Sequence, residues 1–178
     1  MADIALLAAR HTLPSPLPEP TALPPLAVVA LPRLLAYRTA CARAAAAVAR
    51  TDGALPRWIQ LRWRRFCFLG ECAYGCARAP RETLKWHRVV SECVVVPTWW
   101  VAYMNGVADV LAERERIDAS VARDRERLRQ AVEAAGNCEK CKERAFWDMD
   151  EWAEILEHAI EEAISSVSVY LLFIAVKD

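Results

Sequence analysis

The sequence lacks the residues and spacings that mark most catalytic sites. It contains only three histidines and five glycines, and it has no glycine-rich phosphate loop, no G-x-S-x-G and no H-E-x-x-H motif. His11 and His158 lie in helical patterns, and His87 lies in a basic, strand-like run. None of these settings would place a histidine beside a cysteine nucleophile. The sequence therefore predicts that the protein is not an enzyme.

Signals for secretion and membrane insertion are also absent. The first eleven residues have no basic region ahead of their short apolar run, so they do not form a secretory signal. The apolar run near the C-terminus, VSVYLLFIAV, covers about ten residues, whereas a helix needs about 20 to cross a bilayer. The seven cysteines cannot all pair with one another. We therefore expect an intracellular protein, cytoplasmic or nuclear, whose cysteines are thiols or metal ligands.

The composition suits one folded domain. The chain has 178 residues, of which 55% are apolar and 26% charged, so it can bury a core without disulfides. Residues 13–32 hold seven of the ten prolines and predict an extended connector, which follows a short helix over residues 3–11. We therefore divide the chain into residues 1–31, the short helix and proline-rich connector, and residues 32–178, an α-helical domain.

Apolar residues recur every three or four positions through most of the second part, which is the period of an amphipathic helix. Further helices are predicted to start at Pro32, Pro56, Thr98 and Asp118. The longest is expected within residues 138–169, with an inner face made of Ala145, Met149, Trp152, Leu156, Ile160, Ala163 and Val167. The β-branched run at 84–97 predicts at most a short strand. The sequence therefore predicts a mostly α fold, an irregular bundle of five to six helices.

Two segments carry opposite charge, although the formal net charge is zero. Residues 57–88 contain eight basic and two acidic residues, and residues 137–164 contain nine acidic and three basic residues. Opposite potentials attract, so the favoured interpretation is that the two segments neutralise each other within the fold. The alternative is a nucleic-acid surface, in which aromatic residues alternate with Arg57, Arg62, Arg64 and Arg65. For the acidic long helix, a solvated face is favoured over a docking surface.

Four cysteines form two closely spaced pairs: Cys72 with Cys76, and Cys138 with Cys141. Cysteines two to four residues apart can bind one zinc ion together, and the N-terminus of a helix favours the thiolate form of the second pair. The 61 residues between the pairs fit no local zinc finger, so ordinary thiols are the alternative, and Cys67 or His87 could replace one ligand. A redox pair is disfavoured because no βαβ pattern surrounds it. The prediction is a structural zinc site.

Four stretches of the chain follow one another in an order that resembles a known region. They are LLAYRTAC, a cysteine-containing aromatic and basic segment, PTWWVAYM and CEKCKERAFWDMDEWAEILEHAIEEAISSVSV. It is similar to the part that follows the BTB/POZ domain in proteins of mushroom-forming fungi, over roughly residues 4–173. The β-rich BTB core is not in this sequence, so dimerisation through that core does not carry over. The resemblance implies a non-catalytic protein-interaction or scaffold module with an unknown protein partner. A zinc-dependent nucleic-acid-binding module using residues 57–88 is the alternative.

Overall fold

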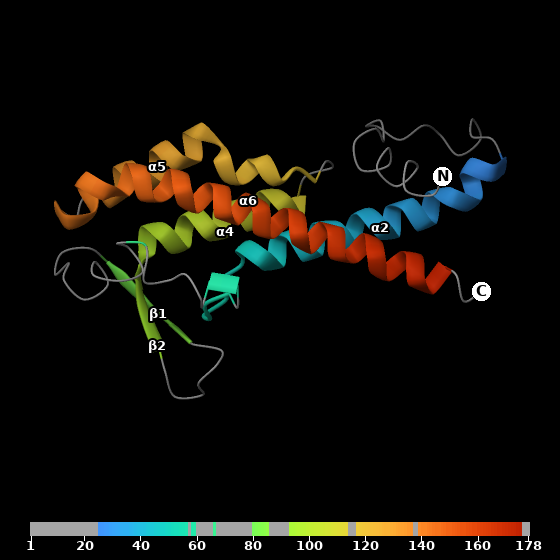
Figure 1. The fold of residues 1–178 in the computed structure, drawn as a ribbon, viewed down its shortest axis with the longest axis horizontal. Coiled ribbons are helices and arrows are strands. Elements are labelled where there is room, and N and C mark those ends of the chain that lie inside the picture. Colours follow the sequence, from blue (N-terminus) through green and yellow to red (C-terminus); the bar gives the residue numbers. More distant parts are fainter. Residues whose placement is uncertain are drawn as a thin grey trace.

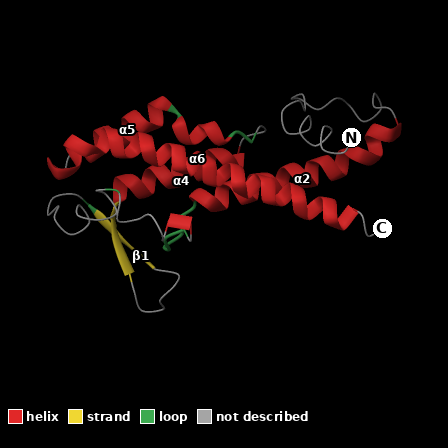
Figure 2. Ribbon diagram, in the orientation of Figure 1, coloured by secondary structure: helices red, strands yellow, loops and turns green. Residues whose placement is uncertain are grey.

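A computed structural model describes residues 25–56, 58–59, 66, 80–85, 93–113, 117–136 and 139–175. Its elements are α2 (Pro25–Ala49), β1 (Arg81–Lys85), β2 (Cys93–Pro97), α4 (Thr98–Glu113), a short 3-10 helix η4 (Ala119–Arg123), α5 (Arg125–Ala135) and α6 (Glu139–Ala175). The predicted mostly helical fold is confirmed (Figure 2). Four α-helices lie within the described residues, whereas the helix expected at 3–11 and most of the one expected from Pro56 lie outside them, so the number five to six is not confirmed.

The two longest helices, α2 and α6, cross in an antiparallel direction and form the frame of the bundle (Figure 1). α4 packs against α2, and α5 and η4 pack against α6. The N-terminal end of α2 and the C-terminal end of α6 both extend beyond α4 and α5 on the same side of the molecule. No helix in the described part of the chain is long and apolar enough to cross a membrane.

α2 begins earlier than the sequence predicted. The helix was expected to start at Pro32, but it starts at Pro25, and Pro32 lies inside it. A proline fits the first turn of a helix, where its missing N–H would be unpaired anyway, whereas an internal proline removes one backbone hydrogen bond. The six residues between the two prolines, LAVVAL, contain no glycine or further proline to end the helix. Residues 25–31, assigned to the connector from the sequence, are therefore helical.

Trp152 of α6 lies at the centre of the core. Its ring meets Phe66 and Trp100 edge-on, with centroid distances of 5.1 and 5.5 Å, and it contacts Trp58 at 5.3 Å. Edge-to-face contacts of this kind are favoured between aromatic rings. Five of the seven predicted inner positions of α6 have no solvent exposure: Ala145, Met149, Trp152, Leu156 and Ile160. The remaining two, Ala163 and Val167, are half-buried, so the predicted inner face is confirmed along most of its length.

The strands β1 and β2 pair in antiparallel register, whereas the sequence predicted at most one short strand. Leu84 of β1 lies opposite Val94 of β2, and both side chains are buried. β1 has the sequence RETLK, whose only β-branched residue is Thr83, so its intrinsic strand propensity is low. β1 therefore forms a strand because it pairs with the valine-rich β2, and not because of its own local sequence.

The helix expected from Asp118 is interrupted at Asp124. The side chain of Asp118 accepts a hydrogen bond of 3.0 Å from the backbone N–H of Ser120 and starts η4. The side chain of Asp124 accepts one of 3.0 Å from the N–H of Arg127 and starts α5. Aspartate favours N-cap positions over helix interiors because its carboxylate bonds free backbone N–H groups. Each aspartate therefore starts a short helix of its own, and α5 ends at Gly136.

Candidate functional site

The predicted zinc site lies almost entirely outside the described residues. Cys72, Cys76 and Cys138 fall there, and Cys141 lies in the first turn of α6, where the backbone is helical. Within the described part of the chain, no group of three or more histidine, cysteine, aspartate or glutamate residues is arranged to hold a metal ion. The zinc site therefore stays a prediction.

Two other cysteines are described, and neither forms a disulfide. Cys41 of α2 is completely buried in the core, where a cysteine packs as a small hydrophobic residue. Cys93 is exposed at the start of β2. Neither belongs to the two cysteine pairs of the predicted zinc site.

Arg57, Arg62, Arg64 and Arg65 of the basic segment all lie outside the described residues, whereas its basic residues Arg81 and Lys85 are exposed on β1. Ile59 and Phe66 are buried, and the Nε1–H of Trp58 donates a hydrogen bond of 2.9 Å to the backbone carbonyl of Val48. An aromatic ring that packs in the core cannot stack on a base. Phe66 is therefore part of the core, and Trp58 packs against it.

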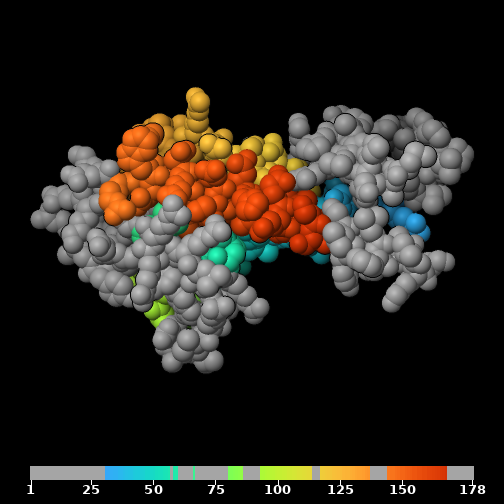
Figure 3. Space-filling model, in the orientation of Figure 1, coloured from blue at the N-terminus to red at the C-terminus, as the bar shows by residue number. Residues whose placement is uncertain are grey.

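The outer face of α6 carries an exposed aromatic pair. The side chains of Phe146 and Trp147 are 59% and 72% exposed, and their rings meet edge-on with a centroid distance of 5.3 Å. Trp147 lies two residues before the buried Met149, so it projects about 200° around the helix from the core side. Among the side chains that the structure describes, the next most exposed large hydrophobic residue is Leu35 of α2, at 36%. Figure 3 shows α6 lying across one face of the molecule.

Acidic side chains continue the same face beyond the aromatic pair. Asp150 and Glu154 follow Trp147 by three and seven residues, a spacing that places them on the same side of the helix. Both are exposed, and neither forms an ion pair with another described residue. Further along, Glu157 pairs with Arg123 of η4 at 3.8 Å. Phe146, Trp147, Asp150 and Glu154 therefore form an aromatic and acidic patch, which we call the α6 patch.

Phe146 and Trp147 were not singled out in the sequence. The signal that could have identified them was the helical period itself, because Ala145 and Met149 define the inner face and Trp147 lies between them on the opposite side. A tryptophan off the inner face of a long helix is a large apolar side chain left in water, and such patches mark binding surfaces when they are contiguous.

No family model, curated protein or solved structure matches this chain. The resemblance to the region after a BTB/POZ domain therefore stays a prediction. The chemistry of the chain's own surface is the basis for inferring its function.

Proposed function

We propose that this protein is a non-catalytic interaction module whose α6 patch binds a basic segment of a protein partner. The observation that supports this function is the exposed, edge-to-face pair of Phe146 and Trp147 beside two acidic residues that have no ion-pair partner among the described residues. Tryptophan is among the residues that dominate the binding energy of protein interfaces. The proposed class is therefore a scaffold or adaptor rather than an enzyme.

The chemistry of the patch defines the chemistry of the partner. An aromatic side chain buries about 150–250 Å² when it is covered, which favours an apolar group on the partner. The carboxylates of Asp150 and Glu154 attract lysine or arginine, and a cationic side chain can also lie over the exposed ring of Trp147. A basic amphipathic segment satisfies both requirements.

The face of α6 opposite the α6 patch packs in the core. Trp152 and Leu156 of α6 are buried in the core, so the backbone beneath the patch is already ordered before a partner binds. A preorganised surface loses less conformational entropy on binding than a flexible one. The α6 patch would therefore be presented to a partner on a backbone that needs no further folding.

We extend the proposal to the two cysteine pairs. Cys72, Cys76, Cys138 and Cys141 are proposed to bind one structural Zn²⁺, and Cys141 is six residues before Trp147 in the same helix. A structural zinc ion contributes its binding free energy to folding, so it would stabilise the beginning of α6. Thiolate ligands are compatible with the reducing cytoplasm or nucleus, where we propose that the protein resides.

The binding proposal is tested with the full chain and a fluorescently labelled peptide of lysine and leucine residues that forms a basic amphipathic helix. Trp147→Ala and the double variant Asp150→Lys/Glu154→Lys should each weaken peptide binding by about tenfold or more, which corresponds to about 1.4 kcal/mol. Trp147→Ala should leave the melting temperature nearly unchanged because the ring is mostly in solvent.

The matched control is the double variant Glu82→Lys/Glu113→Lys. It makes the same change in net charge at exposed positions of β1 and α4, away from the α6 patch. Its affinity for the peptide should stay within about twofold of the unmodified protein. Equal losses in the control and in the α6 variants would mean that the peptide responds only to net charge, which would contradict the proposed site.

A further inference from the structure

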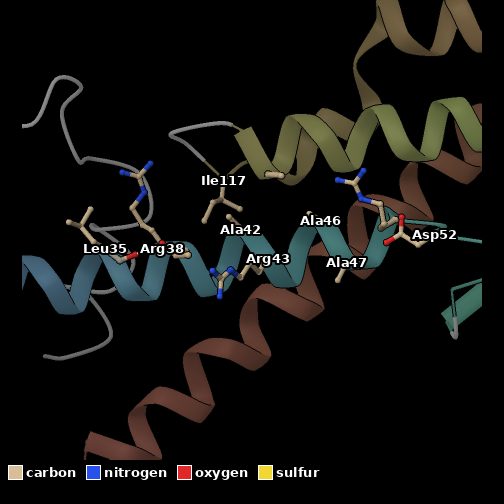
Figure 4. A pocket seen from close by; sticks show the side chains of 11 residues that line it. Leu35, Arg38, Ala42, Arg43, Ala46, Ala47, Asp52 and Ile117 are labelled. Atoms are coloured by element: carbon tan, nitrogen blue, oxygen red, sulfur yellow. Dashed lines mark hydrogen bonds between the residues drawn. The ribbon is translucent and has the colours of Figure 1, made fainter.

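A second surface, separate from the α6 patch, is a groove of about 690 Å³ between α2 and the region around the end of α4. Its floor consists of small side chains, Ala42 and Ala46 of α2 and Ala112 of α4. Ile117, just after α4, faces Ala42 across the groove (Figure 4).

Two arginines flank this apolar floor. α2 contains three arginines and no acidic residue. At about 100° per residue, Arg38 lies about 40° to one side of Ala42, and Arg43 lies about 100° to the other side. Figure 4 shows the two side chains on opposite edges of the helix. The floor is therefore bordered by a guanidinium group on each side.

The positive charge of this groove is neutralised at one end only. Arg50, at one end, forms an ion pair of 2.6 Å with Asp109 of α4, and Asp52 also lines that end. Arg38 and Arg43 form no ion pair with any other residue that the structure describes. The net positive potential is therefore centred on Arg38 and Arg43, beside the apolar floor.

We propose that this groove binds an acidic amphipathic helix of a partner protein. A helix with small or branched apolar residues on one face would cover the alanine floor beside the buried Ile117, in the manner of a helix bound in a groove. Carboxylates on the flanks of that helix would meet Arg38 and Arg43, and arginine binds carboxylate through two parallel hydrogen bonds. The two arginines require a partner segment with negative charge, and the apolar floor requires that one face of this segment be apolar.

The lining of the groove favours a peptide over a nucleic acid. Among the described residues, the lining of the groove includes no aromatic side chain on which a base could stack. The methyl groups of the floor can cover apolar side chains of a peptide, whereas they contribute nothing to phosphate binding. None of the residues of the α6 patch lines the groove, so the two surfaces are independent. The chain would then bind a basic segment on α6 and an acidic one on α2.

The experiment uses the full chain and a fluorescein-labelled helical peptide of about 18 residues, long enough for five turns, with alanine and leucine on one face and glutamate on the flanks. The peptide should bind, and its affinity should fall as salt screens the arginines. The double variant Arg38→Glu/Arg43→Glu should weaken binding by about tenfold or more. Arg33→Glu/Arg125→Glu is the matched control, because Arg33 lies about 180° around α2 from Ala42 and Arg125 is exposed on α5.

A second variant fills the groove without changing the charge. Thr39 is exposed and lines the groove, and its hydroxyl donates a hydrogen bond of 2.9 Å to the backbone carbonyl of Leu35. Thr39→Trp should also weaken peptide binding by about tenfold while α2 stays helical by circular dichroism. The α6 variant Trp147→Ala should bind this acidic peptide normally, which separates the test of the groove from the test of the α6 patch.

Four results would overturn the proposal. The first is unchanged affinity in both groove variants, and the second is an equal loss in the control pair Arg33→Glu/Arg125→Glu. The third is tighter binding of a single-stranded oligonucleotide than of the peptide, lost in Arg38→Glu/Arg43→Glu, which would assign the groove to nucleic acid. The fourth is a dimer of the protein alone that the same variant dissociates, which would assign the groove to a second copy of the chain.

Discussion

The hydroxyl group of Tyr103, in the middle of α4, donates a hydrogen bond of 2.6 Å to the backbone carbonyl of Ala122 in η4. Both residues are buried. Ala122 lies two residues before Asp124, where η4 ends and α5 begins. The hydrogen bond therefore links the junction of η4 and α5 to α4. Burial raises the pKa of the Tyr103 phenol far above its ordinary value, although the nearby Arg127 acts in the opposite direction.

Replacing Tyr103 with phenylalanine should lower the free energy of unfolding by about 1–3 kcal/mol, because the buried carbonyl of Ala122 loses its partner. Urea denaturation would measure this change. Ser165→Ala is the control, since it removes an exposed hydroxyl that bonds the backbone carbonyl of Glu161 at 2.8 Å. The control should change stability by less than about 0.5 kcal/mol. Equal effects of the two substitutions would show that the buried bond has no special importance.

The same tyrosine predicts a dependence on alkaline pH. The folded protein holds the neutral phenol, so its pKa in the folded state is higher than in the unfolded chain, where it is about 10. The stabilisation is complete below pH 10 and is lost as the pH rises further, by up to about 1.4 kcal/mol per pH unit. The unmodified protein should therefore lose stability above pH 10 more steeply than Tyr103→Phe does. Parallel losses in the two proteins, measured by urea unfolding between about pH 9 and 11.5, would rule out this assignment.

Trp152 and Trp147 offer the same substitution in two environments of one helix. Trp152→Ala leaves a cavity among three other aromatic rings and should lower the free energy of unfolding by about 3–5 kcal/mol. Trp147→Ala, on the solvent side, should change it by less than about 1 kcal/mol. Denaturant unfolding compares the two directly. A large destabilisation by Trp147→Ala would mean that this ring belongs to the core and not to a docking surface.

The end of α2 is joined to α4 by one amide side chain. The Oδ1 atom of Asn105 accepts hydrogen bonds from the backbone N–H and the hydroxyl of Thr51, at 3.1 and 3.0 Å. Thr51 is buried, so Asn105→Ala should lower the free energy of unfolding by about 1–3 kcal/mol. Asp109→Ala breaks the more exposed pair with Arg50 nearby and should change it by less than about 1 kcal/mol. A thermal or urea melt that reverses this order would contradict the proposed role of Asn105.

The zinc proposal predicts a metal content of about one Zn²⁺ per chain in protein purified without chelator. Cys138→Ser/Cys141→Ser should lose that metal, and adding a chelator to the unmodified protein should lower its melting temperature because a structural ion contributes to folding. Cys93→Ser is the control, since this exposed thiol is not among the predicted ligands, and it should keep the metal. Metal-free protein that melts unchanged in the presence of chelator would eliminate the zinc site.

The inner faces of the helices could be predicted from the sequence because helical periodicity is a local property. Residues at intervals of three and four share a side of the helix whatever packs on it, so Met149 and Trp152 on α6 were correctly placed in the core. The capping of helices was only partly predictable. Both Asp118 and Asp124 have the chemistry of an N-cap, and the sequence does not reveal that both are used within seven residues.

The candidate surfaces differ in how far the sequence could predict them. The position of Trp147 opposite the inner face of α6 follows from helical spacing alone. The groove on α2 does not, because its wall depends on Ala112 and Ile117, which lie about 70 residues further along the chain than Ala42. No local pattern in α2 indicates which segment will lie beside it.

The sequence by itself determined that this chain is mostly helical and which sides of its helices avoid water, since both follow from the spacing of apolar residues along a few turns. Only the tertiary structure decided that Trp58, Phe66 and Trp100 meet on Trp152, that β1 pairs with β2, and that Ile117 closes over Ala42. Those choices depend on contacts between residues far apart in the chain. Their free energy is gained only when the whole bundle is assembled.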